Sequence, residues 1–398
     1  MSRSRRLLLG VTGGIAAYKS AELTRLFVKA GYDVQVVMTE AATRFVGAAT
    51  FQALSGRPVF VDQWDNRIDN HMAHIDLPRG ADAILIAPAS TDFLFKLAHG
   101  AADDLLSTLC TARDCPLLVA PAMNRQMWEN PPTQRNVALL REDGVHILGP
   151  DQGEQACGEN GMGRMLEPAE LFDRVHAFFQ PKYLRGLKML VTAGPTFERI
   201  DAVRGITNSS SGKMGFAIAK AAADAGAELT LVAGPTMLCT PYGVRRINVV
   251  SAQDMLAAVN AEVAKIDIFV SVAAVADYHV LNQSEHKIKK DANILTLELA
   301  PNPDILANVA SLADPPFCVG FAAESENLLD YAEAKRRRKK LPLLAANLVQ
   351  QAIGADDNEV ILLDDDGQHR LPRAAKEEVA RAIVKHAARL YNKYHPET

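Results

Sequence analysis

Residues 187–215 read LKMLVTAGPTFERIDAVRGITNSSSGKMG, and this stretch decides the fold class of the chain. The apolar run at 189–192 predicts a strand that stops at Gly194, and the pattern KMGFAIAKAAADAG predicts the helix that follows the polar loop. A strand, a glycine turn and a helix together present backbone N–H groups to a phosphate in doubly wound folds. The N-terminus repeats this layout, because the run at 7–11 leads into TGGIAA at 12–17. The sequence therefore predicts two nucleotide-binding regions.

Short, mainly apolar runs recur along both halves of the chain, at 34–38, 83–87, 117–120, 145–148, 229–232, 266–272 and 318–321. Such runs, alternating with helical patterns, indicate parallel sheets that are covered on both faces. Near the end, the segments 360–363 and 369–371 flank an Asp-Asp-Gly turn and predict a hairpin before a final helix. Pro181 and Gly186 interrupt the periodicity between the halves. We therefore expect an α/β chain of two domains, residues 1–186 and 187–398.

The composition of the 398 residues is that of a globular protein with an ample core, with 48% hydrophobic and 23% charged residues. A net charge of −4 argues against a nucleic acid as partner, and no apolar stretch approaches the length that spans a membrane. The five cysteines are odd in number and form no CxxC motif. This pattern is typical of a reducing cytoplasm, where we expect the protein, and any functional cysteine is expected to act alone.

Ligands of open α/β sheets bind beyond the carboxyl ends of the strands. In the first half such ends carry Gly13-Gly14, Pro88-Ala89-Ser90 and Pro121-Ala122-Met123-Asn124. The first of these is not a GxGxxG motif, and Thr39 rather than an acidic residue follows the second strand. These features weaken the case for a dinucleotide and favour a mononucleotide such as FMN, held by loop amides and hydroxyls.

Three further side chains of the first half have two interpretations each. His74 and His71 have the spacing of a metal pair on a helix, but no third ligand is evident, so a solvated or catalytic histidine is the better interpretation. Asn124 is either a helix N-cap or an amide that clasps a carboxylate. Cys157 lies in a loop with three glycines, which suits a lid that delivers a thiol proton better than it suits core packing.

Three motifs in the first half occur together: HIDL from His74, PAMN ending at Asn124, and ACGENGMGRM around Cys157. With them, residues 7–180 resemble the flavin-dependent phosphopantothenoylcysteine decarboxylases, a flavodoxin-like cysteine decarboxylase family. The resemblance implies that His74 acts in decarboxylation, that Asn124 binds the substrate carboxylate, and that Cys157 donates a proton. It also implies an FMN site at Gly13, Gly14, Ile15, Ala16, Thr39, Ser90 and Thr91, although many relatives have Ala-Asn where Thr91-Asp92 stands.

The chemistry of that family explains the need for a flavin. A cysteinyl carboxylate leaves as CO2 only if the resulting carbanion has an electron sink. Oxidation of the thiol by FMN to a thioaldehyde provides one, and the enethiol that remains must then be reduced and protonated. The cofactor carries the redox chemistry, while the protein orients the substrate and supplies the proton.

The second half contains a loop that superficially resembles a P-loop. Six residues rather than four separate Gly205 from Gly212, and Met214 stands where a Ser or Thr would bind magnesium, so it is not a Walker A motif. Its small hydroxyl residues before a helix nevertheless suit an anion site. We expect Asp277 to end a buried strand, where an unpaired carboxylate is costly, so a magnesium or ribose role follows.

Two basic runs lie in the same predicted domain. Lys287 and Lys289 fall on one side of an extended segment, and Lys335 and Lys339 fall on one face of a helix. A solvated surface is the ordinary interpretation of such runs, and a nuclear-localisation or nucleic-acid role fits an acidic chain poorly. Neutralisation of a triphosphate is the third interpretation, and it is favoured because Asp277 and several strand ends share the domain.

Residues 188–395 resemble the bacterial phosphopantothenate–cysteine ligases in the motifs AGPTFERIDAVR (193–204), TNSSSGKMG (207–215), AAVADY (273–278), KIKK (287–290), NPDI (302–305) and GFAAE (320–324). The resemblance implies a Rossmann-like domain that activates phosphopantothenate with CTP and Mg²⁺, giving an acyl-cytidylate that the amine of cysteine attacks. Asn208 and Arg204 then hold this intermediate, and Lys287 stabilises charge during phosphoryl transfer. Ser209 stands where relatives often have His.

The same resemblance implies a nucleotide site formed by Ala274, Asp277, Lys287, Asn302, Pro303, Asp304, Ile305, Phe321, Lys335 and Lys339, with the metal ion at Asp277. Because the product of the ligase is the substrate of the decarboxylase, we expect one bifunctional enzyme with small-molecule substrates. The alternatives are a nicotinamide-dependent oxidoreductase and a non-catalytic flavoprotein regulator. The family also implies a homo-oligomer.

Overall fold

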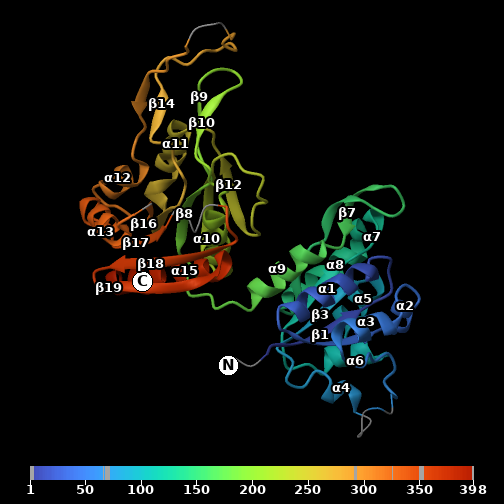
Figure 1. Cartoon of the computed structure of the whole chain (residues 1–398). Coiled ribbons are helices and arrows are strands. Elements are labelled where there is room, and N and C mark those ends of the chain that lie inside the picture. Colours follow the sequence, from blue (N-terminus) through green and yellow to red (C-terminus); the bar gives the residue numbers. More distant parts are fainter. Residues whose placement is uncertain are drawn as a thin grey trace. The chain divides into compact units, whose positions relative to one another are not determined.

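The computed structural model describes residues 4–65, 67, 72–290, 294–324, 326–348 and 354–396. Its contacts divide the chain between His176 and Ala177 into two compact units, called unit 1 and unit 2 below (Figure 1). Both units are α/β, as the sequence predicts. Among the described residues, no helix combines the length and the apolar character needed to cross a membrane.

Unit 1 is built on a sheet of five parallel strands in the order β2-β1-β3-β4-β5. The strands are β1 (Arg6–Val11), β2 (Asp33–Met38), β3 (Ala83–Ala89), β4 (Leu117–Pro121) and β5 (His146–Ile147). This order is that of flavodoxin-like doubly wound folds. The fold class expected for the first domain is therefore confirmed.

The remaining elements of unit 1 are α1 (Ala17–Lys29), α2 (Glu40–Thr43), α3 (Ala48–Ser55), α4 (Ala73–Asp76), α5 (Thr91–His99), α6 (Leu105–Thr111), α7 (Arg125–Glu129), α8 (Pro131–Glu142), β6 (Asp151–Glu154) and β7 (Asn160–Arg164), with α9 (Pro168–Phe178) at the division. α5, α6 and α8 share one core with Leu8, Ile84 and Ile86 of the sheet. α1 contacts β1, β2 and β3 but adds no residue to that core, so it covers the opposite face. β6 and β7 form an antiparallel hairpin.

A buried threonine joins two neighbouring strand ends of unit 1. Thr12 follows β1 and is 1% exposed. Its Oγ1 donates to the carbonyl of Pro88 at 2.8 Å and accepts from the N–H of Ser90 at 2.9 Å. The turn after β1 is thereby fixed to the turn after β3, because one hydroxyl bonds a carbonyl and an N–H of the second turn.

Unit 2 is built on an eight-stranded sheet in the order β12-β11-β8-β13-β16-β17-β18-β19. Its strands are β8 (Lys188–Ala193), β11 (Glu228–Ala233), β12 (Val244–Asn248), β13 (Ile268–Ser271), β16 (Phe317–Glu324), β17 (Leu343–Leu348), β18 (Asp357–Asp364) and β19 (Gly367–Ala375). The first six strands in the sheet are parallel, and β18 and β19 add an antiparallel hairpin at one edge. The predicted hairpin near the chain's end is confirmed.

Helices cover both faces of this second sheet: α10 (Lys213–Asp224), α11 (Ala252–Glu262), the 3₁₀ turn η1 (Val263–Lys265), α12 (Ile305–Ala310), α13 (Leu328–Arg338) and α15 (Lys376–Tyr394). α10 and α15 share one core with the sheet, and α11, α12 and α13 share the core on the other face. Gly215 allows α10 to approach β8 closely, because a Cβ there would lie 2.5 Å from the Cβ of Ala193.

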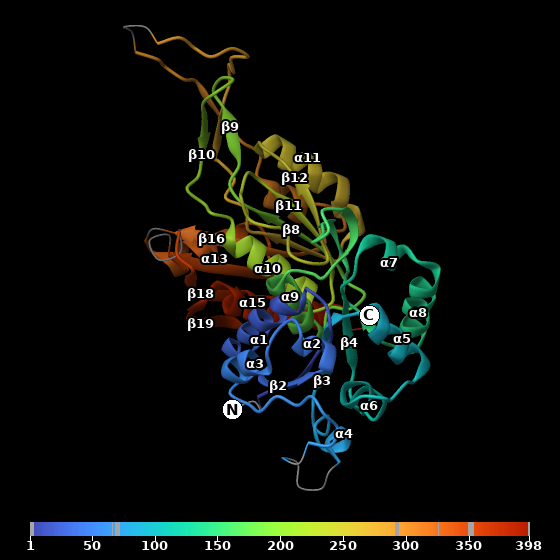
Figure 2. The same cartoon turned by 90° about the vertical axis from the view of Figure 1, so that its right-hand side faces the viewer.

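Two short hairpins extend the carboxyl edge of unit 2 and were not predicted. β9 (Phe197–Arg199) pairs with β10 (Gly205–Thr207), and β14 (Tyr278–Val280) pairs with β15 (Leu299–Pro301). Figures 1 and 2 show β9 and β10 leading away from the sheet, and β14 contacts β9. The edge of the sheet that carries the predicted ligase residues is therefore enlarged by paired strands.

The Thr12 hydroxyl can be tested with two substitutions. Thr12→Val keeps the side-chain shape but leaves the part-buried Ser90 N–H without its acceptor, and it removes one of the two donors to the Pro88 carbonyl, which keeps the backbone N–H of residue 12 at 3.3 Å. We expect a loss of about 1–3 kcal/mol in the free energy of opening of β1 and β3. Hydrogen exchange of the amides of these strands in the full chain measures it. Thr12→Ser retains the hydroxyl and should stay close to the wild type, so equal exchange in all three proteins would contradict this role.

Candidate active sites

The glycine turn of unit 1 offers unpaired backbone donors. Gly13 packs against the next turn, because a Cβ there would lie 2.6 Å from the Cβ of Ala41. Within the described part of the chain, the N–H groups of residues 13–16 donate to no protein acceptor. They precede the N-terminus of α1, where backbone N–H groups and the helix dipole favour negative charge. Ile15 is 62% exposed beside them. The turn can therefore bind an anionic group.

Two hydroxyls predicted at the FMN site stand at the ends of the strands on either side of β1. Thr39 follows β2 and caps α2 by accepting from the N–H of Ala42 at 3.3 Å. Ser90 follows β3 and caps α5 by accepting from the N–H of Phe93 at 3.2 Å. Because a hydroxyl that accepts one bond still has a proton to donate, both remain able to bind a ligand. β1 lies between β2 and β3 in the parallel sheet, so these residues and the glycine turn after β1 lie at one edge.

Asn124 is the N-cap of α7, and both interpretations of this residue fit its geometry. Its Oδ1 accepts from the N–H of Met127 at 2.9 Å, as expected of a cap. Its Nδ2 makes no hydrogen bond to the described residues, and it is the atom that would donate to a carboxylate. The preceding loop is joined to the FMN candidates, because Thr91 Oγ1 donates to the Sδ of Met123 at 3.2 Å.

Cys157 lies in the turn of the β6–β7 hairpin, where the sequence predicts a glycine-rich lid. Gln155 connects this turn to the Asn124 loop: its Oε1 accepts from the N–H of Arg125 at 3.0 Å, and the Sγ of Cys157 lies 4.0 Å from the same oxygen. The N–H of Met123 also donates to the carbonyl of Gly163 at 2.9 Å. Cys157, which is exposed, and Asn124 are thus brought to one place.

A second connection, which the sequence analysis missed, ties the end of β7 to α1. Lys19 is buried, and its Nζ donates to the carbonyl of Met165 at 3.1 Å and to Glu167 at 2.7 Å. The hydrogen bond from Lys19 holds the pKa of Glu167 below its usual value. A single lysine in a helix gives no sequence signal of such a bond. Because of it, the Cys157 hairpin is fixed to the helix that begins at the glycine turn.

His74 is not brought to this group within one unit. It lies in α4, which contacts α6. Figure 1 shows α4 at the end of unit 1 opposite to α7 and β7. His71, the second histidine of the pair that the sequence analysis weighed as metal ligands, lies outside the described residues. The structure therefore groups Asn124 and Cys157 with the FMN candidates, but places the helix of His74 elsewhere.

In unit 2, Arg204 is bound to a buried carboxylate that the sequence analysis did not select. Asp201 accepts from Arg204 Nε at 2.9 Å and from its Nη2 at 2.5 Å, and from the N–H of Ile288 at 3.2 Å. Arg204 Nη2 also donates to the carbonyl of Ile288 at 2.9 Å. The hydrogen bonds from Arg204, and then those from backbone N–H groups, hold the pKa of Asp201 far below its usual value. Asp201 and Arg204 thereby clamp the backbone of Ile288, which is distant from both in sequence.

This clamp positions the first basic run. Ile288 is half-buried between Lys287 and Lys289, and both lysines are exposed. The expectation that the two lysines point to one side is consistent with this burial pattern. Since Arg204 binds Ile288, which lies between the two lysines, Arg204, Lys287 and Lys289 all lie around one backbone segment.

Asn208 and Ala274 are in direct contact. Asn208 Nδ2 donates to the carbonyl of Ala274 at 3.0 Å. The N–H of Thr196 donates to the same carbonyl at 3.2 Å, and the N–H of Ala274 donates to Gly194 at 2.9 Å. Gly212, with a φ of 77°, supplies the left-handed turn that starts α10. The polar loop before α10 and the loop after β13 therefore form one surface.

Asp277 differs from the expectation in one respect. β13 ends at Ser271, and Asp277 is exposed rather than at the end of a buried strand, so no desolvation penalty demands a cation there. It adjoins another predicted residue, since the N–H of Asn302 donates to its carbonyl at 2.8 Å. Asn302 Nδ2 also donates to the carbonyl of Ala276 at 2.9 Å. Asp277 and Asn302 are therefore in contact, but the burial argument for the metal ion was wrong.

Four predicted nucleotide residues meet beside β16. Lys335 Nζ donates to the carbonyl of Phe321 at 2.9 Å, and Lys339 Nζ lies 2.5 Å from Asp304 Oδ2. Asp304 also caps α12, placing Pro303 and Ile305 on either side of it at the start of that helix. Burial lowers the pKa of Lys335, and the charge of Lys339 lowers it further. Burial alone would raise the pKa of Asp304, but the hydrogen bond from Lys339 brings it below the usual value.

Comparison with known proteins identifies relatives over nearly the whole chain. The family described as Flavoprotein matches residues 1–180, and the family described as DNA/pantothenate metabolism flavoprotein C-terminal domain matches residues 184–391. The "Coenzyme A biosynthesis bifunctional protein CoaBC" of Vibrio cholerae is 50% identical over 386 residues, which are 96% of this chain and 97% of that protein. The protein of the same name from Escherichia coli K12 is 47% identical over 96% of each chain.

Among solved structures, the C-terminal domain of a coenzyme A biosynthesis bifunctional protein CoaBC is 40% identical to this chain. It covers 53% of this chain and 99% of its own, with a TM-score of 0.47. The full-length relatives, rather than this partial match, establish the family.

The Asp201 clamp makes a prediction about pH. Asp201→Asn removes the negative charge that accepts the N–H of Ile288. The amide hydrogen of Ile288 should therefore exchange roughly 10-fold faster or more at neutral pH. In the wild type the depressed pKa keeps Asp201 ionised, so the protection should persist from about pH 8 to about pH 5 and be lost only in stronger acid. Hydrogen exchange corrected for intrinsic rates measures both effects. Asp356→Asn, an exposed carboxylate paired with Lys213, is the matched control. Loss of protection between pH 8 and 5 would contradict the clamp.

Proposed function

This chain belongs to the family of bifunctional coenzyme A biosynthesis proteins, and we propose that its two units are a ligase and a decarboxylase that act in succession. Unit 2 joins 4′-phosphopantothenate to cysteine with CTP, and unit 1 converts the product to 4′-phosphopantetheine. The observation that carries the proposal is the grouping of Asn124 and Cys157 by Gln155, next to unpaired N–H groups at the start of α1. A proton donor, an amide for a carboxylate and an anion site are the parts that such a decarboxylase needs.

The ligase reaction begins with a carboxylate, which resists nucleophiles. A carboxylate oxygen of phosphopantothenate attacks the α-phosphorus of CTP, so an acyl–phosphate bond forms and pyrophosphate leaves. The amine of cysteine then attacks the acyl carbon, CMP leaves, and the amine loses a proton. Lys335 and Lys339 neutralise phosphate charge beside β16, and Lys287 does so from the loop that Arg204 holds.

The remaining contacts of Arg204 and Asn208 suit the acyl-cytidylate. A guanidinium has five N–H donors, and the Nη1 of Arg204 donates to no acceptor in the described residues. Asn208 stands at the loop before α10, against Ala274. Asp277 is an exposed carboxylate of the kind that binds Mg²⁺ together with substrate phosphates, and the ion there would neutralise the triphosphate.

The FMN candidates of unit 1 fit an anionic mononucleotide. The N–H groups of residues 13–16 receive the phosphate, and the hydroxyls of Thr39 and Ser90 stand at the flanking strand ends. When bound, FMN would supply the two-electron oxidation of the substrate thiol and the return reduction after CO2 has left. Asn124 Nδ2 orients the substrate carboxylate, and the Sγ–H of Cys157 supplies the proton for the return step. Gln155 positions the turn that carries Cys157.

His74 acts on the departing carboxylate group in this proposal. Since its helix lies apart from α7 and β7 in one copy, the His74 of a second copy would complete the site in the homo-oligomer expected from the sequence. This arrangement leaves Asn124 and Cys157 on one copy and the histidine on the other.

The decarboxylase assignment is tested with two exposed cysteines, Cys157 and Cys239. With phosphopantothenate, cysteine, Mg²⁺ and CTP, Cys157→Ser should release pyrophosphate normally but lower phosphopantetheine formation by roughly 100-fold or more. Because its proton is needed only after CO2 has left, CO2 should stop after a single turnover while the flavin absorbance stays bleached. Cys239→Ser should match the wild type.

Other outcomes identify the alternatives. Pyrophosphate without CO2 in the wild type would leave a ligase joined to a silent flavoprotein unit. If the wild type forms neither pyrophosphate nor CO2, the result would favour a non-catalytic regulator. NAD binding without bound flavin would favour a nicotinamide-dependent oxidoreductase.

The lowered pKa of Lys335 predicts the pH dependence of nucleotide use. The ammonium form binds the triphosphate, so kcat/KM for CTP should fall as pH rises through this pKa, below the range of an ordinary lysine. Lys335→Arg keeps the positive charge at alkaline pH and should move this limb upward. Pyrophosphate release at low CTP concentration, measured against pH, tests it. An alkaline limb that is unchanged in Lys335→Arg would contradict the role of Lys335.

A further inference from the structure

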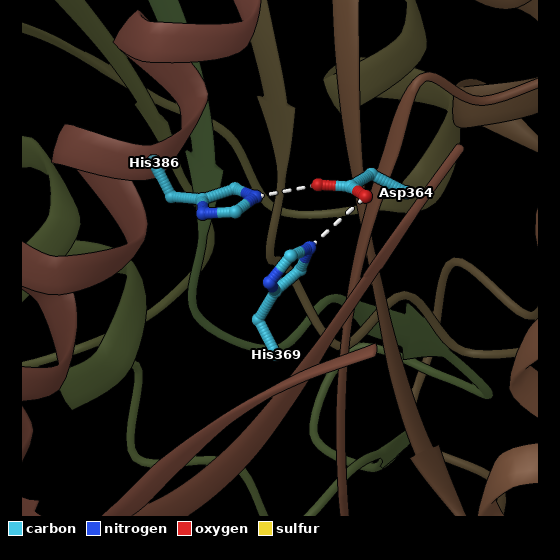
Figure 3. A group of neighbouring side chains, drawn as sticks. All are labelled: Asp364, His369 and His386. Atoms are coloured by element: carbon cyan, nitrogen blue, oxygen red, sulfur yellow. Dashed lines mark hydrogen bonds and ion pairs between the residues drawn. The ribbon is translucent and has the colours of Figure 1, made fainter. Parts of the chain in front are cut away.

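Two histidines and a buried aspartate converge at the edge of the sheet in unit 2, away from the predicted ligase residues in sequence. Asp364 ends β18, His369 lies on β19, and His386 lies on α15 (Figure 3). Asp364 Oδ1 lies 3.1 Å from His369 Nε2, and Asp364 Oδ2 lies 2.6 Å from His386 Nε2. One ligand-type atom from each of the three residues lies within 4.8 Å of the others.

We propose that Asp364, His369 and His386 form a binding site for one divalent transition-metal ion, with Zn²⁺ as the best fit. Imidazole nitrogens with one carboxylate oxygen are ligands that suit Zn²⁺, whereas Mg²⁺ and Ca²⁺ prefer oxygen ligands alone. Two ligand atoms on a tetrahedral Zn²⁺ stand roughly 3.3 Å apart. The separation of 3.1 Å between Asp364 Oδ1 and His369 Nε2 is close to this value. The separation of 2.6 Å between Asp364 Oδ2 and His386 Nε2 is shorter and involves the other carboxylate oxygen, so the His386 ring would move outward to admit the ion.

The carboxylate is already fixed by its surroundings. The Asp364 side chain is fully buried, and its Oδ1 also accepts from the N–H of Asp366 at 2.8 Å. Such an additional hydrogen bond orients a metal ligand and raises its affinity for the ion. The side chain of His369 is 36% exposed, so solvent reaches the cluster and can supply a fourth ligand. The fixed carboxylate and the access of solvent both suit a three-residue site.

Arg389 faces the cluster and has another carboxylate, that of Asp366, within reach. Arg389 Nη2 lies 3.8 Å from Asp364 Oδ2 and 3.5 Å from His386 Nε2, and its Nη1 lies 3.9 Å from Asp366. The Arg389 side chain is 54% exposed, so it can move toward Asp366 when an ion enters. Lys393 already binds Asp366 at 2.7 Å. The competing arrangement is a cluster held by hydrogen bonds alone, with the carboxylate between two imidazoles.

The ion would join three elements that meet at the end of the sheet. β18 and β19 are the edge hairpin, and α15 packs across α10 on one face. The next residue of the turn, Asp365, binds Arg336 of α13 at 2.8 Å and Tyr394 of α15 at 2.9 Å. A metal ion at Asp364 would therefore stabilise the turn that links α13 on one face of the sheet to α15 on the other. Its role would be structural.

The test uses the full chain after chelator treatment and dialysis. Titration calorimetry with ZnCl2 should show a site that His369→Gln and His386→Gln each weaken by roughly 100-fold or more, since even outer partners of metal ligands are worth about 10- to 100-fold. His146→Gln, an exposed histidine of unit 1, should retain it. Co²⁺ bound at the same site should give visible d–d bands without a sulfur-to-cobalt charge-transfer band, which separates it from the cysteines. Zn²⁺ should also raise the melting temperature of the wild type and of His146→Gln only.

His369 is partly exposed, so its variant should fold even if a change at buried Asp364 does not. Equal Zn²⁺ affinity in the wild type, His369→Gln and His386→Gln would overturn the proposal. So would the absence of a Zn²⁺-dependent melting shift in the wild type, which would leave the three residues as a hydrogen-bonded cluster.

Discussion

A buried threonine hydroxyl joins the ends of two neighbouring parallel strands in each unit, and both candidate sites depend on this interaction. Thr12 follows β1 and accepts from the N–H of Ser90, just past β3. Thr192, in β8, accepts from the N–H groups of Val272 and Ala273, just past β13, at 3.2 and 3.3 Å. Both threonines are 1% exposed. Loops at the carboxyl edge of a parallel sheet otherwise lack the ladder bonds that would hold them, so a hydroxyl in this place fixes the floor of a ligand site.

At the carboxyl edge of each sheet, different kinds of hydrogen bonds and ion pairs hold the functional loops of the two units. Unit 1 uses one neutral amide and one ion pair: Gln155 ties the Cys157 turn to the N–H of Arg125, and Lys19 ties the end of the same hairpin to α1 through the carbonyl of Met165 and the carboxylate of Glu167. Unit 2 uses charged pairs, in which Asp201 and Arg204 hold Ile288 and Lys339 holds Asp304. The difference fits the charges that the two proposed reactions present. A triphosphate calls for an array of cations, and these cations need carboxylates beside them when the site is empty.

The sequence predicted the elements whose signals are local. The strand, glycine turn and helix from β8 to α10 were recognised because an apolar run, a glycine and a helical period are adjacent in the chain. The three small hairpins were missed, since strands of three to five residues with mixed polarity, such as β7 (NGMGR), gain their stability from pairing and not from composition. The burial expected of Asp277 was wrong because β13 ends six residues earlier, a boundary that alternation of apolar residues does not fix.

The sequence by itself determined the family, the two α/β regions and the residue types at each site, because motifs and periodicity are written along the chain. Only the tertiary structure decided which of these residues share a place. It joined Cys157 to Asn124 through Gln155 and Arg204 to the Lys287 loop through Asp201, and it separated the helix of His74 from α7. It also brought Asp364, His369 and His386 together from two strands and a helix. Hydrogen bonds between residues distant in sequence depend on how the strands order themselves in the sheet, and no local pattern records that order.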